Sequence, residues 1–334
     1  MAAGLLSMLT SCEEEIFEKP SNTYIDNFEY AWKKLDTHYG LFITKNIDWN
    51  KVYGDHITQA MQVTNDQQLY DVLGSMVKTL NDKHVNVYTT SKELRDYNSG
   101  EGGHIPAQED IKFDVIEGNY LTEYHVLSED IGYGVLKSGM GYVHISAFKE
   151  SLKSFEDNAD VILNNLHDAP SIIVDIREHS GGDDRVSKYI AGRFASSKKL
   201  FMTTKKKNGP AHDSFEAPVE WYVQPEGGKQ FTGPVVLLTS SHSISAAETF
   251  TLAMKQNENV IQVGATTAGA FSDQVFFELP NGWFITVSVG DYRAADGTSF
   301  EGIGIAPEIE AISKKEELQE GIDKALEAAI ETLM

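Results

Sequence analysis

The chain has 334 residues and a single cysteine, Cys12, and this scarcity excludes two kinds of covalent framework. One thiol cannot form an internal disulfide, and it cannot build a cysteine-based metal site. Proline is also scarce, with 9 residues, while 41% of the chain is hydrophobic. This composition predicts a globular protein rather than a disordered one, long enough for one large domain or two smaller ones.

Basic residues are few as well. Lys and Arg total 28 against 50 Asp and Glu, which gives a formal net charge of −22. Such acidity argues against binding to nucleic acid or to an anionic membrane surface. The one basic run, residues 205–207, is best explained as a solvated loop. The sequence also lacks G-x-S-x-G, H-E-x-x-H and a post-strand G-x-G-x-x-G, so no hydrolase elbow, metal or nucleotide cofactor is predicted.

The most informative segment is T-S-S-H-S-I-S-A-A-E-T-F, residues 239–250. It follows a short β-branched run at 235–238, typical of a buried strand, and turns helical from Ala246. Ser245 would then lie at a helix N-terminus, where the unpaired N–H of Ala246 could bind a developing oxyanion. The alternative is structural, because Ser245 and Glu248 also have the spacing of a capping box.

Three other segments bear on that choice. Residues 171–182, S-I-I-V-D-I-R-E-H-S-G-G, form an apolar run that ends in a double-glycine turn. T-L-N-D-K-H-V, residues 79–85, places His84 after an amphipathic helix, and F-E-G-I-G-I-A-P-E, residues 300–308, places Glu301 in a glycine-rich turn. In this order, over roughly residues 25–330, the segments resemble the tail-specific or C-terminal-processing serine peptidases. That family includes the tricorn core and interphotoreceptor retinoid-binding protein.

The resemblance implies an α/β fold with a crotonase-like core of β-α units and an N-terminal helical domain. It also implies Ser245 as the nucleophile. The processing branch activates its serine with a lysine, but Ala270 stands at that position here, so a Ser-Lys dyad is not expected. The tricorn-like branch uses a histidine and a glutamate, which are matched by His84 as base and Glu301 as orienting carboxylate. The implied function is a serine peptidase that cleaves extended or unfolded polypeptides without a cofactor.

The sequence alone leaves several residue assignments open. The oxyanion hole would combine the Ala246 N–H with that of Gly181 or Gly182, although the two glycines could equally form an ordinary turn. His242 and His179 are rival bases, and Ser243 is a rival nucleophile. The alternative function is a non-catalytic binding protein for an apolar ligand or peptide, because retinoid-binding relatives have this fold.

The predicted organisation has five parts. They are a lipoprotein signal at 1–12, a tether at 13–22, an N-terminal helical domain at 23–97, a short β-rich connection at 98–140 in place of a PDZ domain, and a catalytic core at 141–334. Within the connection, residues 111–116 suggest a strand. Strands at 172–176, 235–238 and 260–263 alternate with helices in the core, which predicts parallel β-α units. Pro280-Asn281-Gly282 predicts a hairpin, and one amphipathic helix beginning with a capping box at Ser313 should close the chain.

The N-terminal region predicts the cellular location. Residues 1–9 are small and apolar, and Leu9-Thr10-Ser11-Cys12 resembles a bacterial lipobox, in which the cysteine is lipidated and becomes the mature N-terminus. The stretch is too short to span a bilayer. We therefore expect an extracytoplasmic protein, attached to a bacterial outer membrane only through lipid on Cys12. No oligomeric state is predicted.

Overall fold

The computed structural model describes residues 21–100 and 110–334. The predicted lipoprotein signal, with Cys12, and most of the predicted tether lie outside these residues. Within the described ranges, no helix is both long and apolar enough to cross a membrane.

The N-terminal part begins with three helices, α1 (Tyr24–His38), α2 (Trp49–Ala60) and α3 (Asp66–Lys78). Each starts where a short polar side chain accepts a hydrogen bond from the first turn, as an N-cap residue does. The caps are Thr23, Asp48 and Asn65. The apolar faces of the helices share one core, which confirms the helical periodicity seen in the sequence.

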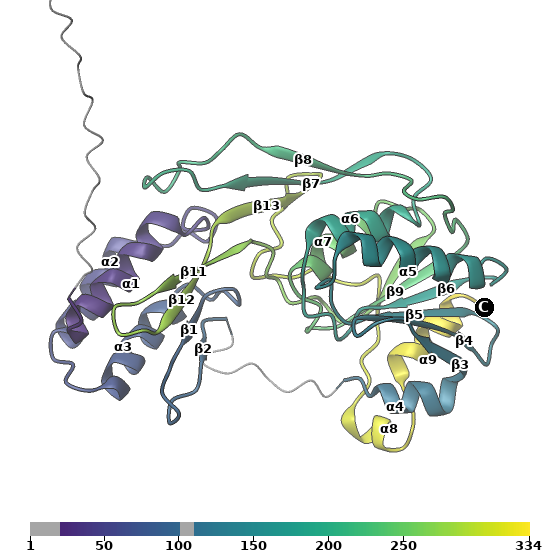
Figure 1. The fold of residues 1–334 in the computed structure, drawn as a ribbon, viewed down its shortest axis with the longest axis horizontal. Helices are drawn as coiled ribbons and strands as arrows, with labels where there is room; N and C mark the ends of the chain where they lie inside the picture. The colour runs from purple at the N-terminus through teal and green to yellow at the C-terminus, as the bar shows by residue number, and fades with distance from the viewer. Residues whose placement is uncertain (1–20, 101–109) are drawn as a thin grey trace, which may run out of the picture.

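A four-stranded antiparallel sheet completes this part of the molecule. It has the order β11-β12-β1-β2, with β1 (Asn86–Tyr88), β2 (Tyr97–Asn98), β11 (Gln274–Glu278) and β12 (Phe284–Ser288). The predicted hairpin is confirmed: β11 pairs with β12, and Gly282 in the turn has φ +84°. The hairpin lies beside the purple helices α1 to α3 in Figure 1. Val87 of β1 pairs with Ile285, so a late segment of the chain builds the N-terminal sheet.

A seven-stranded mixed sheet forms the other part, in the order β14-β10-β9-β6-β5-β4-β3. The strands β5 (Gly141–Ile145), β6 (Ile172–Asp175), β9 (Val235–Thr239), β10 (Val260–Gly264) and β14 (Ile309–Glu310) run parallel, whereas β3 (Leu121–Val126) and β4 (Ile131–Leu136) are antiparallel. This confirms the predicted α/β class and its parallel β-α units. The remaining strands, β7 (Lys199–Lys206), β8 (Val219–Val223) and β13 (Gly290–Ala294), form a third sheet that extends over both parts (Figure 1).

Helices cover both faces of the large sheet, as Figure 1 shows. One face packs on α5 (Leu152–Asn165), α6 (Asp184–Gly192) and α7 (Ala246–Met254), and the other on α9 (Lys324–Thr332). The alternation is visible along β6, where Ile172 and Val174 join the first core and Ile173 the second. A strand buried on both faces reads as a continuous apolar run, and this is why 172–176 and 235–238 were recognisable in the sequence.

Three predicted elements differ from the structure. The basic run at 205–207, expected in a solvated loop, lies in β7 and directly after it. The strand expected at 111–116 is wrong: residues there form α4 (Phe113–Val115) and the π-helical turn η1 (Ile116–Tyr120). A run this short fits both the two-residue period of a strand and the 3.6-residue period of a helix. The burial of Ile111, Val115 and Ile116 follows the helical period. The single closing helix is also wrong. Gly321, with φ +83°, separates α8 (Lys315–Gln319) from α9, and Asp323 caps the second helix.

Sheet pairing places part of the predicted connection in the core. Strands β3 and β4 lie within residues 98–140 but pair directly with β5 of the large sheet. The five boundaries given above remain a sequence-based prediction, whereas the backbone pairing joins 121–136 to the core and the 274–288 hairpin to the N-terminal sheet.

Candidate active site

The turn between β9 and α7 holds Ser245 in an unusual conformation. Its φ of 63° and ψ of −121° lie outside the extended region that N-cap residues normally adopt, and it is one of three non-glycine residues with positive φ in the described ranges. Glu248 accepts a hydrogen bond from the Ser245 N–H at 3.3 Å, which is one half of the predicted capping box, whereas the Glu248 N–H donates to the Ser245 carbonyl at 2.8 Å and not to the hydroxyl. Such strain persists only where the surroundings impose it, and it concentrates at functional sites.

The rival nucleophile Ser243 has a structural role. It is fully buried, and its hydroxyl donates to the Ile176 carbonyl at 2.8 Å while accepting from the Ser240 N–H at 3.0 Å. The Ser240 hydroxyl in turn donates to the Arg177 carbonyl at 2.6 Å. Both serines therefore fasten the loop before Ser245 to the end of β6.

The double-glycine turn lies directly against Ser245. Gly181 has φ +98° and Gly182 φ +137°, conformations that side chains other than glycine rarely adopt. A Cβ on Gly181 would lie 2.9 Å from Ser245 Cβ, and one on Gly182 only 2.1 Å from the Phe148 carbonyl oxygen. The turn thus requires both glycines for close approach as well as for φ.

The three oxyanion candidates differ in how their N–H groups are used. The Gly181 N–H donates to His179 Nδ1 at 3.1 Å, so it is already engaged. Within residues 21–100 and 110–334, neither the Gly182 nor the Ala246 N–H has a hydrogen-bond partner. This geometry favours Ala246 and Gly182 as donors to a ligand.

His84 and Ser245 line the same cavity, whose volume is about 960 Å³. The cavity lies between the two parts of the molecule, with β1 and β11 residues on one side and the Gly182 and Ser245 turns on the other. His84 is 5% exposed, and burial lowers the pKa of its imidazole, an effect that Asp82 and Asp273 oppose. A neutral imidazole at neutral pH can accept a proton.

The rival bases occupy different environments. His179 is completely buried, its Nδ1 accepts the Gly181 N–H, and its ring packs edge-on against Phe148 at 4.3 Å. Burial lowers the pKa of His179 to about 3, which makes it a support for the glycine turn rather than a base. His242 lines the same cavity as Ser245, so the geometry leaves it as a competitor of His84.

Glu301 lies behind the cavity and is not among the described residues that line it. Its Oε2 accepts from the Phe271 N–H at 2.9 Å, and its Oε1 is 3.8 Å from Lys45 Nζ. Burial, and then the charge of Asp82, raise the pKa of Glu301 to about 8, against the influence of Lys45. The structure thus brings Ser245 and His84 to one cavity and sets Glu301 in a buried layer next to it.

The turn at 264–270 is held against Ser245 from the other side. Glu248 is fully buried, and its carboxylate accepts from the Thr267 hydroxyl at 2.6 Å and from the Gly269 and Ala270 N–H groups at 2.7 Å each. The Ala270 carbonyl accepts from the Ser245 N–H at 3.1 Å. Ala270 therefore adjoins the nucleophile position, where its methyl group supplies no base.

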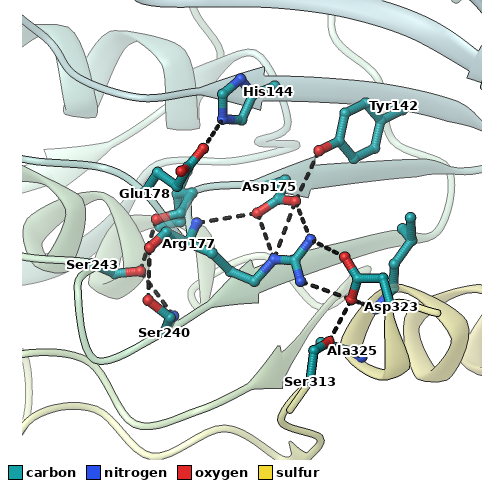
Figure 2. A network of polar contacts seen from close by, with 12 residues as sticks. Tyr142, His144, Asp175, Arg177, Glu178, Ser240, Ser243, Ser313, Asp323 and Ala325 are labelled. Atoms are coloured by element: carbon teal, nitrogen blue, oxygen red, sulfur yellow. Dashed lines mark hydrogen bonds and ion pairs between the residues drawn. The ribbon is translucent and has the colours of Figure 1, made fainter. Parts of the chain in front are cut away.

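A buried ion network fixes the strand from which the glycine turn departs (Figure 2). The Arg177 guanidinium contacts Asp175 at 2.6 Å and Asp323, the cap of α9, at 2.9 Å, and all three side chains are at most 1% exposed. Tyr142 donates to Asp175 at 2.8 Å, and Ser313 donates to Asp323 at 2.7 Å. The network ties α9 to the end of β6, whose carbonyls anchor the Ser245 loop. In the described part of the chain, no group of three or more His, Cys, Asp or Glu side chains could hold a metal ion.

Comparison with known proteins now identifies the family. The sequence model of Peptidase family S41 matches residues 139–311, and that of the tricorn protease C1 domain matches residues 20–78. The chain belongs to peptidase family S41. This confirms the resemblance deduced from the four segments.

Individual relatives match mainly the core. The chain is 26% identical over 175 residues to the carboxy-terminal processing protease CtpA of Bacillus subtilis, and 28% identical over 170 residues to the chloroplastic carboxyl-terminal-processing peptidase 3 of Arabidopsis thaliana. These alignments cover 52% and 51% of this chain but only 35% and 31% of the relatives. The S41 chain thus spans about a third of the length of these curated relatives.

Solved structures match over almost the whole chain. A candidate peptidase from Parabacteroides merdae ATCC 43184 has a TM-score of 0.82 and 27% identity, covering 94% of this chain and 98% of that one. Mature CPAF complexed with lactacystin has a TM-score of 0.68 at 11% identity, with 93% of this chain and 97% of that chain covered. The second likeness shows a shared fold.

Sequence reasoning missed several residues that shape the site. Tyr39 and Lys45 come from the N-terminal helical part of the chain. Lys45 nevertheless contacts Glu301, and the charge of Glu301 raises the pKa of Tyr39. Asp82 lies two residues before His84, so its position in the sequence could have indicated that it belongs to the site. The positions of the other two carried no such indication, because their contacts depend on packing between distant segments.

Proposed function

We propose that this S41 chain is a serine endopeptidase that cleaves extended or unfolded polypeptides, with Ser245 as nucleophile, His84 as general base and Glu301 as orienting carboxylate. The observation that carries the proposal is the strained Ser245 conformation, with its hydroxyl free of a cap bond, in the wall of a cavity that also contains His84. A serine that only capped α7 would adopt extended geometry and accept a hydrogen bond from the first turn.

The chemistry follows from these positions. Ser245 Oγ attacks the carbonyl carbon of the scissile peptide while its proton passes to His84, and the resulting oxyanion accepts from the N–H groups of Ala246 and Gly182. His84 then gives the proton to the leaving amine as the C–N bond breaks. Water repeats the sequence on the acyl-enzyme, which releases the acid and restores the serine.

The lining of the cavity favours a polypeptide over an apolar ligand. Six of the side chains that line it are charged or are histidines: Lys83, His84, Glu178, Lys206, His242 and Asp273. Its large apolar or aromatic side chains are fewer: Tyr88, Ile244, Val275 and Val289. A carrier of an apolar molecule needs a predominantly apolar lining, whereas a peptide backbone offers donors and acceptors along its length. The mixed lining supports the enzyme over the binding protein.

Labelling with a fluorophosphonate probe tests the assignment. The wild type should be labelled, Ser245→Ala should not, and the same variant should lose turnover of a denatured-protein substrate. Ser241→Ala is the matched control, since this exposed serine lines the same cavity and should keep both signals. Labelling and turnover that survive in Ser245→Ala would overturn the proposal. A wild type that binds denatured protein but takes no label would support the binding function instead.

We also propose that Cys12 is lipidated and tethers the protein to a bacterial outer membrane, facing away from the cytoplasm. The support is the Leu-Thr-Ser-Cys sequence after an apolar run. Stable attachment needs more than one acyl chain, which a diacylglyceryl cysteine supplies. Cys12→Ser should move the protein to the soluble fraction of a Gram-negative host. A wild-type protein whose mass shows no lipid would refute the tether.

A further inference from the structure

Four buried polar atoms around His84 make no hydrogen bond of normal geometry among the described residues, although the Tyr39 hydroxyl faces Asp82. They are Tyr39 Oη, Asp82 Oδ2, His84 Nδ1 and Glu301 Oε1. Buried polar atoms are normally paired, so several unpaired ones in a single layer call for an explanation. Their presence next to the cavity wall points to a functional cluster rather than to the general stability of the fold.

Asp82 is the carboxylate nearest to His84 along the backbone, and its position is fixed. It is 1% exposed, and its Oδ1 accepts from the His84 N–H at 2.8 Å. Its own N–H donates to Ser99 Oγ at 3.2 Å. Lys45 Nζ holds the preceding turn by donating to the carbonyls of Leu80 and Asn81, at 3.1 and 2.8 Å. Asp82 is thus fixed at the His84 backbone N–H, and its charge acts on the imidazole.

The charges around His84 separate Asp82 from Glu301. Burial is the main cause that lowers the pKa of His84; Asp82 is the strongest of the groups that raise it, followed by Asp273, while Lys45 lowers it. Glu301 is not among the groups that shift the pKa of His84; its own pKa is raised by Asp82 and lowered by Lys45. The other charged or titratable side chains that line the cavity with His84 are Lys83, Tyr88, Glu178, Lys206 and His242.

The two carboxylates are close enough to oppose each other's ionisation. After burial, the Asp82 charge is the largest influence that raises the pKa of Glu301. The Tyr39 hydroxyl lies within reach of both, since after burial Asp82 and then Glu301 raise its pKa. A nearby like charge disfavours the ionised form of a buried carboxyl group, so the raised pKa of Glu301 indicates that Asp82 and Glu301 belong to one cluster.

We propose that Asp82 is a positioning residue for His84: its buried carboxylate holds the His84 backbone through Oδ1 and acts on the imidazole directly, whereas Glu301 acts on the imidazole only through Asp82 and Tyr39. The catalytic part of this inference rests on the proposed serine peptidase function. The protonation of His84 does not, and it can be measured separately.

The test is an NMR titration of the full chain with labelled histidine. The chain has 10 histidines, and His84→Gln identifies the signal of His84. Asp82→Asn keeps an oxygen that can accept the His84 N–H and removes only the charge, so it should lower the pKa of His84 by about 1 unit or more. Glu301→Gln is the matched control: it keeps an acceptor for the Phe271 N–H and should shift the pKa of His84 by less than half as much.

Activity provides the second readout. Asp82→Asn should lower kcat by about 100-fold with little change in KM, as expected for weakened general base catalysis, and should move the acid limb of the profile to lower pH. Glu301→Gln should lower kcat less and should move the acid limb less than Asp82→Asn does. If Asp82→Asn does not fold, Asp82→Ser, which also keeps an acceptor oxygen, replaces it.

The outcomes are distinguishable from failure of the peptidase function. If the wild type takes no fluorophosphonate label but Asp82→Asn still lowers the pKa of His84, the enzyme proposal fails and the positioning role stands. If Glu301→Gln shifts the pKa of His84 more than Asp82→Asn does, or Asp82→Asn leaves it unchanged, the inference is overturned.

Discussion

Gly181 and Ser245 touch across two separate turns, so that a Cβ on Gly181 would lie 2.9 Å from Ser245 Cβ and 3.3 Å from Ser245 Oγ. A contact of 2.9 Å is essentially never made by a real Cβ atom, so Ser245 and the glycine turn can pack this closely only with glycine at residue 181. The proposed oxyanion site therefore depends on the absence of a side chain there.

Gly181→Ala should disable the site. The added methyl group must displace Ser245 or the turn, and residue 181 also needs φ +98°. Because small displacements of reacting groups are costly, we expect the rate of fluorophosphonate labelling to fall by about 100-fold. Gly139→Ala is the control, since Gly139 has φ +85° but no atom within 4 Å of its Cβ position. It should lose about 1 kcal/mol of unfolding free energy and label normally. Unchanged labelling of Gly181→Ala would contradict the proposed geometry.

Ser243→Ala should weaken the fold and spare the chemistry. The substitution leaves the Ile176 carbonyl and the Ser240 N–H without their buried partner. Unsatisfied buried groups cost about 1–3 kcal/mol, so urea denaturation should show a decrease of that size in unfolding free energy. The folded fraction should still take the label. Loss of labelling in a folded Ser243→Ala protein would reinstate Ser243 as the nucleophile.

Arg177→Met should be strongly destabilising. Removing the guanidinium leaves Asp175 and Asp323 buried without their cation, a change that costs about 3–5 kcal/mol. Arg185→Met removes a similarly spaced Arg–Asp pair, with Asp183, that lies on the surface, and should change stability little. Equilibrium urea unfolding of the two variants measures the difference. Equal effects would mean that the network in Figure 2 does not anchor α9.

The pH dependence should follow His84. Burial lowers the pKa of its imidazole, so the neutral base persists to lower pH than a free histidine, whose pKa is about 6.5. The rate of labelling should therefore stay level as pH falls from 8 and decline only below about 6.5. His242→Gln should leave this limb in place. A limb that moves in His242→Gln would assign the base to His242 instead, and a limb at or above pH 7 would contradict the lowered pKa of His84.

Local sequence patterns predicted the elements that depend only on nearby residues. The apolar run before Ser245, the helix after it and the turn at Gly282 were all recognisable, because strand, helix and turn preferences act over a few residues. Patterns of that range fail where two periods fit equally well. This is why the sequence predicts a strand at residues 111–116 and a single unbroken helix across Gly321.

The sequence by itself determined the α/β class, the family and four of the residues that line the cavity, His84, Gly182, His242 and Ser245. Tertiary structure alone decided which of them work together. It engaged the Gly181 N–H with His179, buried Ser243, and brought Tyr39, Lys45 and Asp82 next to Glu301. It also paired the 274–288 hairpin with β1. The reason is physical: these contacts join segments far apart in the chain, and their energies come from packing and burial, which no local pattern encodes.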